Sequence, residues 1–314
     1  MTWRRSGPLL VVALGLVLMF ALPAMLSLFG VVEVTIFVVM AILALSQGFI
    51  WGYGGILSFG QAAFFGLGGY TYAVAAINMG ESTVPFLLAI AVPALFAALL
   101  GYFMFYGRIS DVYIGVITLT VSIILFNVVN STAGDVYHIG DAALGGFNGI
   151  PSVPPLNMPG QPDAQFGPEE MWYASMGLLI LTYIGLKALL ASHFGRVVVA
   201  IRENETRAAL LGYDPRAYKL LVFVVGGGVA GLAGCMFTNW GAFISPTVFG
   251  LATSAQVIIY VMVGGLGTLI GPILGGVAIQ ALIANIGTQQ TFNANLVLGA
   301  ILLVFVLLAR CRAR

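Results

Sequence analysis

Long apolar stretches, separated by short turns rich in glycine and polar residues, occupy most of the chain. A helix needs about 20 mainly apolar residues to cross a bilayer, and most of these stretches approach that length. The pattern predicts an all-α polytopic membrane protein with about ten spans in one transmembrane domain, residues 1–314. The predicted spans are approximately residues 9–29, 34–51, 57–78, 85–106, 112–130, 172–191, 218–240, 254–266, 269–286 and 293–310.

Composition agrees with this pattern, because 60% of the 314 residues are hydrophobic and only 7% are charged. A soluble fold needs polar residues over most of its surface, so a soluble globule is excluded. The 12 basic residues lie at the ends of apolar stretches, and ten spans with a cytoplasmic N-terminus place all of them on the cytoplasmic side. Both termini are then predicted to be cytoplasmic. No basic patch interleaved with aromatic residues points to nucleic acid.

Two polar segments interrupt the spans. Residues 131–171 contain five acidic residues, several prolines and no Lys or Arg, and are predicted to form an external, periplasmic loop. Residues 192–217 hold four arginines and three acids, and are predicted to form a cytoplasmic helical elbow that ends at Gly212 and restarts at Asp214-Pro215. A signal for topology needs only basic residues, so the interleaved acids favour a docking surface for a soluble partner.

Each half of the chain contains one glycine-dense break in its apolar pattern. Irregular backbone at membrane depth persists only against protein or a water-filled cavity, so paired breaks indicate a translocation pathway between two related halves. Close helix packing through small residues is the alternative, and it is favoured for Gly66, Gly69, Gly231, Gly234 and residues 226–228. The predicted pathway residues are Gly52, Gly55, Ser58, Gly60 and Gln61 in the first break, and Gly264, Gly265, Gly267 and Thr268 in the second.

Charged residues are missing from the middle of every predicted span. Carriers driven by protons or sodium usually need such charges, so the remaining amides, hydroxyls and glycines suit a small neutral or zwitterionic solute. The sequence has no phosphate-binding loop of the G-x-x-x-x-G-K-[ST] type, no catalytic triad and no metal-ligand spacing. It therefore predicts a translocation subunit and not an enzyme, with no bound cofactor, and any ATP hydrolysis is expected on a separate chain.

Five segments resemble the permease subunits of branched-chain amino-acid ABC importers, a family that also includes urea and short-chain amide importers. They are WGYGGILSFGQAAFFGLGGY (51–70), FGRVVVAIRENE (194–205) with Leu211-Gly212-Tyr213 after it, AGLAG (230–234), FISP (243–246) and VGGLGT (263–268). The resemblance implies a bacterial inner-membrane subunit with a second related permease and a periplasmic solute-binding protein. It also implies two cytoplasmic subunits that use ATP and magnesium.

By the same resemblance, residues 202–212 would be the coupling helix that contacts an ATP-binding subunit. The family signature in this loop is Glu-Ala-Ala with a glycine six residues after the Glu. This chain keeps Ala208 and Gly212 but has Thr206 and Arg207 at the first two positions. The residues expected to couple to the ATPase are Arg202, Glu203, Asn204, Glu205, Arg207, Ala208 and Gly212.

The leading hypothesis is thus an ATP-driven importer of branched-chain or related amino acids. Import of urea or a short-chain amide is the alternative within the family. An ATP-independent carrier or channel would need an intramembrane charge or a selectivity ring, and the sequence contains neither. A purely structural subunit is compatible with the packing glycines.

Overall fold

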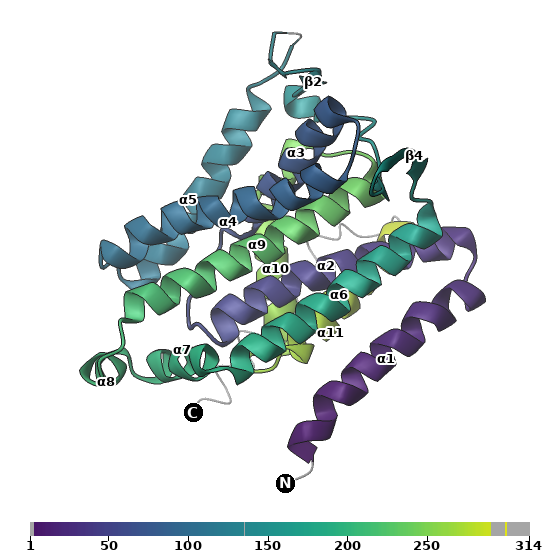
Figure 1. The fold of residues 1–314 in the computed structure, drawn as a ribbon. Coiled ribbons are helices and arrows are strands. Elements are labelled where there is room, and N and C mark those ends of the chain that lie inside the picture. Colours follow the sequence, from purple (N-terminus) through teal and green to yellow (C-terminus); the bar gives the residue numbers. More distant parts are fainter. Residues whose placement is uncertain (1–2, 135, 290–298, 300–314) are drawn as a thin grey trace.

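The chain is mostly helical, as the sequence predicted (Figure 1). The computed structural model describes residues 3–134, 136–289 and 299. By length and composition alone, five of the described helices could cross a membrane, namely α2, α4, α5, α6 and α9. The described helices are α1 (Trp3–Met25), α2 (Leu28–Gly52), α3 (Gln61–Met79), α4 (Thr83–Tyr106), α5 (Asp111–Asn130), α6 (Pro168–Ala191), α7 (His193–Glu203), α8 (Glu205–Leu210), α9 (Pro215–Gly241), α10 (Leu251–Gly264) and α11 (Ile270–Gln289).

Several helix ends differ from the predicted spans. The first two helices are separated at residues 26–27, earlier than predicted, because the Ser27 side chain accepts a hydrogen bond from the Gly30 N–H at 3.3 Å and starts α2. Helix α6 begins at Pro168, a residue suited to the first helical turn, and this shortens the segment that was predicted to be external from 131–171 to 131–167. The predicted span 293–310 lies outside the described residues except for residue 299.

Helix α3 packs closely against α9 through small residues. A Cβ atom added at Gly68 would lie 2.2 Å from the Gly231 carbonyl oxygen, and one at Gly234 would lie 1.8 Å from the Phe65 carbonyl oxygen. Only glycine permits such backbone approach, so the predicted packing role of Gly231 and Gly234 is confirmed, and Gly68 shares it. Gly228 differs, because the nearest atoms to an added Cβ are 3.6 Å away and alanine would fit there.

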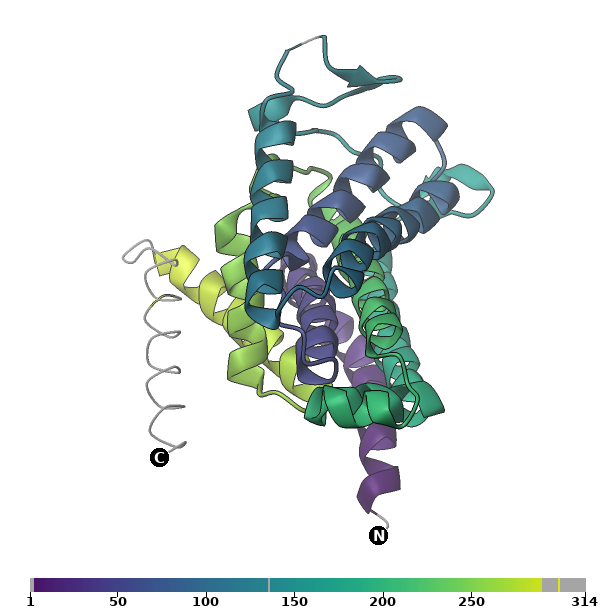
Figure 2. The ribbon, with the colours of Figure 1, turned by 90° about the vertical axis from the view of Figure 1, so that its left-hand side faces the viewer.

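The two polar segments lie at opposite ends of the helical bundle (Figure 2). Helices α7 and α8 run across one end. The other end carries residues 131–167, with the hairpins β1 (His138–Ile139) to β2 (Ala142–Ala143) and β3 (Asn157–Met158) to β4 (Gln161–Gln165), and the short 3-10 helix η1 (Gly146–Asn148).

Residues 131–167 are fixed to the bundle by hydrogen bonds. Ile150 and Ile244 exchange backbone hydrogen bonds of 2.8 and 3.2 Å, just before the 3-10 helix η2 (Pro246–Phe249). The Tyr72 hydroxyl donates to the Pro154 carbonyl oxygen at 3.1 Å, and the Ser82 hydroxyl donates to Asn157 Oδ1 at 2.5 Å. This end of the molecule is therefore a docked cap and not a free flap.

Candidate functional site

The elbow formed by α7 and α8 is built by local capping signals. Asn204 ends α7 and accepts a hydrogen bond from the Arg207 N–H at 2.8 Å, which starts α8. Gly212 follows α8 with a φ of +91°, and the Asp214 side chain then accepts from the Arg216 N–H at 3.1 Å to begin α9. The predicted helix stop at Gly212 and restart at Asp214-Pro215 are confirmed.

Aromatic contacts hold the elbow to the start of α9. The rings of Phe194 and Tyr218 stack with centroids 5.4 Å apart, and Tyr213 meets Tyr218 edge-on at 6.1 Å. His193 Nε2 and the Tyr213 hydroxyl are 3.3 Å apart. Ala208 is buried in a small apolar cluster beneath these rings, so the elbow and the base of α9 form one packed unit.

The tip of the elbow exposes two leucines that the sequence-based site did not include. Leu210 is 84% exposed and Leu211 is 72% exposed, although both lie at the polar end of the bundle. The one sequence feature that could have indicated their exposure was their position just before Gly212, at the end of a short helix. Only Ala208 is buried in that six-residue helix. Large apolar side chains exposed together in this way commonly mark a surface that a partner covers.

Arg202 joins the elbow to the first glycine-dense break. Its guanidinium donates to the carbonyl oxygen of the buried Gly52, at the end of α2, and forms an ion pair with Glu203 at 2.5 Å. A Cβ atom at Gly55, where φ is +71°, would lie 2.9 Å from Arg202 Cγ. Residues predicted separately for coupling and for the pathway are thus in direct contact.

The inner part of the first break is irregular, non-helical backbone held by neutral side chains. Helix α3 begins only at Gln61, so residues 53–60 are not helical although the predicted span began near residue 57. Gln47 Nε2 donates to the Ser58 carbonyl oxygen at 2.9 Å, and Gln61 Nε2 donates to Ser46 Oγ at 2.8 Å. The Oε1 atoms of Gln47 and Gln61 remain buried and unpaired. Such backbone survives inside a bundle because protein groups replace water as its partners.

Gly60 completes this inner part by allowing a close approach to α5. A Cβ atom at Gly60 would lie 2.7 Å from the Thr118 carbonyl oxygen, and the Phe59 N–H donates to Thr118 Oγ1 at 3.1 Å. The first break therefore contacts α5 as well as α2.

The second break is a tight turn between α10 and α11. A Cβ atom at Gly264 would lie 1.9 Å from the Gly271 carbonyl oxygen, while Gly265 and Gly267 have φ values of +88° and +98°. Thr268 is exposed, and its hydroxyl accepts from the Gly271 N–H at 3.1 Å, which caps the start of α11. The glycines here serve the turn, and Thr268 serves as a cap.

Tyr53 links the two breaks. Its hydroxyl donates to the Gly267 carbonyl oxygen at 3.1 Å. Tyr53 directly follows Gly52 in the chain, whose carbonyl oxygen accepts a hydrogen bond from Arg202. A continuous set of contacts therefore runs from the elbow through Arg202 to the first break, and through Tyr53 to the second.

A charged bridge connects the elbow to α5. Lys219 Nζ lies 2.5 Å from Glu205 at the start of α8 and 3.7 Å from Asp111 at the start of α5. The Lys219 side chain is only 14% exposed. These residues line a polar pocket of about 370 Å³ that also includes Arg108 and Arg216, so the elbow contacts the bundle at a second, purely electrostatic point.

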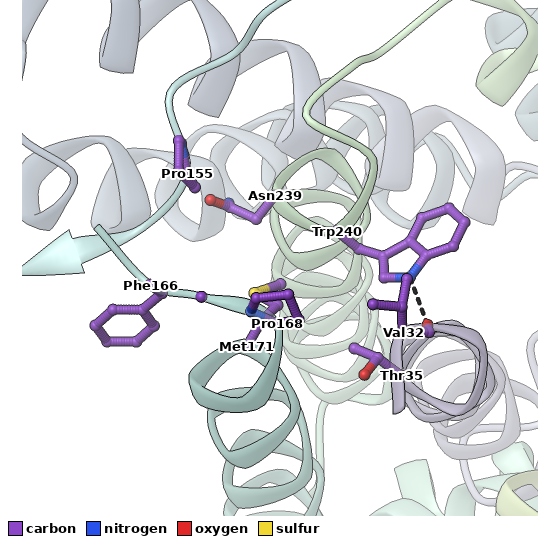
Figure 3. A pocket seen from close by; sticks show the side chains of 9 residues that line it. Val32, Thr35, Pro155, Phe166, Pro168, Met171, Asn239 and Trp240 are labelled. Atoms are coloured by element: carbon purple, nitrogen blue, oxygen red, sulfur yellow. Dashed lines mark hydrogen bonds between the residues drawn. The ribbon is translucent and has the colours of Figure 1, made fainter. Parts of the chain in front are cut away.

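A small pocket opens at the opposite end of the bundle, between the first turns of α2 and α6 and the last turn of α9 (Figure 3). It measures about 140 Å³ and has mainly apolar walls. Asn239 lines it, and its Nδ2 donates to the Cys235 carbonyl oxygen at 2.9 Å. The Oδ1 atom of Asn239 is buried and has no hydrogen-bond partner among the described residues. The lining residues of the pocket are Val32, Thr35, Pro155, Phe166, Gly167, Pro168, Met171, Asn239 and Trp240.

No group of three or more His, Cys, Asp or Glu side chains within the described ranges is placed to hold a metal ion.

The chain matches the family described as "Branched-chain amino acid transport system / permease component" over residues 33–307. It is 28% identical over 321 residues to the high-affinity branched-chain amino acid transport system permease protein LivM of Escherichia coli (strain K12), covering 93% of this chain and 71% of that protein. It is 33% identical over 148 residues to the inner membrane ABC transporter permease protein YjfF of the same organism, covering 44% of each. It is also 27% identical over 133 residues to the permease protein LivH of the Salmonella typhimurium branched-chain system, covering 41% of this chain and 43% of LivH. No solved structure matches.

Proposed function

The chain belongs to the family of permease components of branched-chain amino acid transport systems, and on this basis we propose that it is the membrane-spanning subunit of an ATP-driven importer. The solute is a branched-chain or related amino acid, with urea or a short-chain amide as the alternative. The observation that carries the proposal is the unbroken set of contacts from the exposed elbow, through Arg202, to both breaks. A carrier that needs no ATP-binding partner would have no use for such an elbow.

The assembly we propose follows from the relatives. One similar protein is named as an ABC transporter permease, and LivM and LivH are both permease proteins of branched-chain systems. The chain would pair with a second related permease, two cytoplasmic ATP-binding subunits that use ATP and magnesium, and a periplasmic solute-binding protein. It would lie in the bacterial inner membrane with about ten spans in two related halves and with both termini in the cytoplasm.

Helix α5 offers a surface for the second permease. Val116, Thr120, Ile123 and Asn127 are exposed at intervals of three and four residues, so they lie along one side of the helix. Thr120 and Asn127 place polar groups on this otherwise apolar side. The Thr120 hydroxyl donates to the Val116 carbonyl oxygen within the helix at 2.9 Å. An exposed amide such as Asn127 on an apolar helix favours contact with protein or a pathway over contact with lipid tails.

In the proposed cycle, ATP-driven closure of the partner subunits moves the elbow. Arg202 then displaces the end of α2 and the first break, Tyr53 carries the movement to the second break, and Lys219 carries it to α5. Two sites and two states linked in this way form a coupled machine in which solute binding also acts back on the ATPases. In this cycle the two breaks open and close the translocation pathway.

Lys219→Met should lower uptake about fivefold, which corresponds to losing roughly 1 kcal/mol of coupling between elbow and α5. Lys219→Arg keeps the charge and should stay near the wild-type rate. Arg216→Met is the matched control, because Arg216 lines the same pocket without an ion pair in the described part of the chain. The measurement is solute transported per ATP hydrolysed in proteoliposomes. Equal loss in the Lys219→Met and Arg216→Met variants would contradict the assignment.

We assign the pocket of Figure 3 to early contact with the solute, since its end of the bundle would face the periplasm. The unpaired Asn239 Oδ1 would accept a hydrogen bond from the solute's amino group, and the apolar walls would contact its side chain. A hydrogen bond to a charged group contributes roughly 1.5–3 kcal/mol.

Asn239→Leu should therefore reduce the initial uptake rate about tenfold at limiting solute. Thr35→Val is the matched control, because Thr35 lines the same pocket but its hydroxyl already donates to the Val31 carbonyl oxygen at 2.7 Å. A similar reduction in both variants would show that packing, and not the Asn239 oxygen, is responsible.

The function itself is tested by uptake of labelled leucine and labelled urea in cells with and without the chain, before and after ATP depletion. ATP-dependent leucine uptake that is lost with the chain supports the amino-acid importer. Loss of urea uptake alone would identify the protein as an importer subunit for urea or a short-chain amide. Uptake that needs the chain but persists without ATP overturns the importer.

A further inference from the structure

An apolar groove runs along the outside of the bundle between α1 and α11. It encloses about 310 Å³, and its floor is formed by α2 and α6. Leu14 of α1 and Leu274 of α11, which line its two sides, are 60% and 62% exposed, so the groove is open to the outside of the bundle at these residues. Representative lining residues are Leu14, Leu18, Phe37, Met176, Ile273 and Leu274.

Helix α1 is tied to the bundle at two points beside this groove. A Cβ atom at Gly15 would lie 3.3 Å from Ile180, and Trp172 Nε1 donates to the Met19 carbonyl oxygen at 2.9 Å. These two contacts hold α1 against α6 while α11 lines the opposite side of the groove.

The surroundings define what fills the groove. It lies between the shorter apolar helices α1 and α11, over a floor of α2 and α6, which are long and apolar enough to cross a membrane. In the proposed membrane subunit its open side would therefore face the hydrocarbon of the bilayer. Empty apolar space beside lipid is unfavourable because its walls lose their dispersion contacts. An extended acyl chain matches the elongated, wholly apolar shape.

Lys187 of α6 follows the groove-lining residues of that helix toward the elbow end. The groove-lining residues of α6 recur every three or four positions through Leu179 and Tyr183, and Lys187 is the next position of this stripe. Lys187 is exposed and has no ion-pair partner among the described residues. Helical side chains generally lean toward the N-terminus of their helix, and on this basis we expect Lys187 to reach toward Tyr183, the groove-lining residue one turn before it.

We propose that this groove is a binding site for an anionic phospholipid, with one acyl chain between α1 and α11 and the phosphate beside Lys187. The site lies at the elbow end of the bundle, at the leaflet where anionic lipids and basic residues attract each other. The bound lipid completes the packing of α1. This site is independent of the solute and of the ATP-binding partners.

Trp172 lines the groove and reports on it directly. The protein is placed in nanodiscs of a neutral phospholipid containing increasing fractions of phosphatidylglycerol with brominated acyl chains, which quench tryptophan fluorescence. The signal of Trp172 is the difference between the wild type and Trp172→Phe. We expect half-quenching at a lower fraction of brominated phosphatidylglycerol than of brominated phosphatidylcholine.

Lys187→Gln should remove this preference, shifting half-quenching about fivefold toward the neutral lipid's value, the equivalent of roughly 1 kcal/mol per basic residue. Lys187→Arg should retain the preference. Leu18→Phe, which fills the groove, should reduce quenching by both lipids. Arg196→Gln, an exposed basic position on α7, is the control for general surface charge and should change nothing.

Each outcome decides the matter. An unchanged preference in Lys187→Gln, or a loss of preference in Arg196→Gln as large as that in Lys187→Gln, would overturn the headgroup assignment. Quenching that Leu18→Phe leaves unchanged would mean that Trp172 senses only bulk lipid, and the groove would not be a site. Monodisperse size-exclusion profiles of all variants separate these results from misfolding.

Discussion

Replacing Leu210 and Leu211 together with aspartate should reduce ATP-dependent uptake at least about a hundredfold while the chain remains folded in the membrane. The two side chains are 84% and 72% exposed, so they contribute little to the fold of this subunit. If an ATP-binding subunit covers them, each is a buried apolar anchor, and such anchors typically contribute 2 kcal/mol or more apiece. Aspartate would also bury an unpaired carboxylate in the contact.

The measurement combines uptake in cells with co-purification of the ATP-binding subunit. Arg196→Asp is the control, because it adds a carboxylate at an exposed position near the other end of the elbow. Normal uptake by the double variant would show that Leu210 and Leu211 do not contribute to the interface with the ATP-binding subunit. Lost uptake with full retention of the ATP-binding subunit would show that the leucines act after docking and do not hold the partner.

The elbow was readable from sequence because its signals are local. Asn204, Gly212 and Asp214 each act within three or four residues, through a cap or a positive φ, and the structure has them as expected. The two breaks were equally readable from their glycines. Local chemistry of this kind does not depend on which helix lies alongside.

The contacts between these segments were not readable. Arg202 and Gly52 are 150 positions apart, and Tyr53 and Gly267 are 214 apart. No periodicity or cap links such positions. They meet only because α7 packs against α9, and because α9 and α11 both pack against α2. The same holds for Lys219, whose position one helical turn into α9 gives no hint that Glu205 and Asp111 lie on either side of it.

The predicted pathway residues have different surroundings, which the sequence did not distinguish. Ser58 and Gln61 are buried in a network of amides and hydroxyls, whereas Gly55 and Thr268 are exposed at the elbow end. Polarity and glycine content mark irregular backbone, but they do not say whether a side chain faces a cavity, a neighbouring helix or the surface. That depends on tertiary packing.

Arg202→Met should uncouple the transporter, lowering uptake roughly 10- to 100-fold while the ATP-binding subunit stays bound. The methionine keeps the aliphatic part of the side chain against Gly55 but leaves the buried Gly52 carbonyl oxygen without its donor. A hydrogen bond from a charged group contributes roughly 1.5–3 kcal/mol, and here it joins the moving elbow to the first break. Without it, ATP hydrolysis should continue at its basal rate and no longer respond to solute, because coupling acts in both directions.

Two variants separate this contact from its neighbours. Glu203→Gln removes the ion pair with Arg202 but leaves the bond to Gly52, and it should remain near the wild-type rate because exposed pairs contribute about 0–1 kcal/mol. Gly55→Val leaves Arg202 in place but forces a β-branched residue into a φ of +71° and a Cβ to within 2.9 Å of Arg202 Cγ, so it should reproduce the uncoupled state. The ratio of solute transported to ATP hydrolysed in proteoliposomes measures all three. If Arg202→Met keeps the wild-type ratio, or if Glu203→Gln loses as much, the elbow drives the breaks through some contact other than the Arg202 hydrogen bond to Gly52.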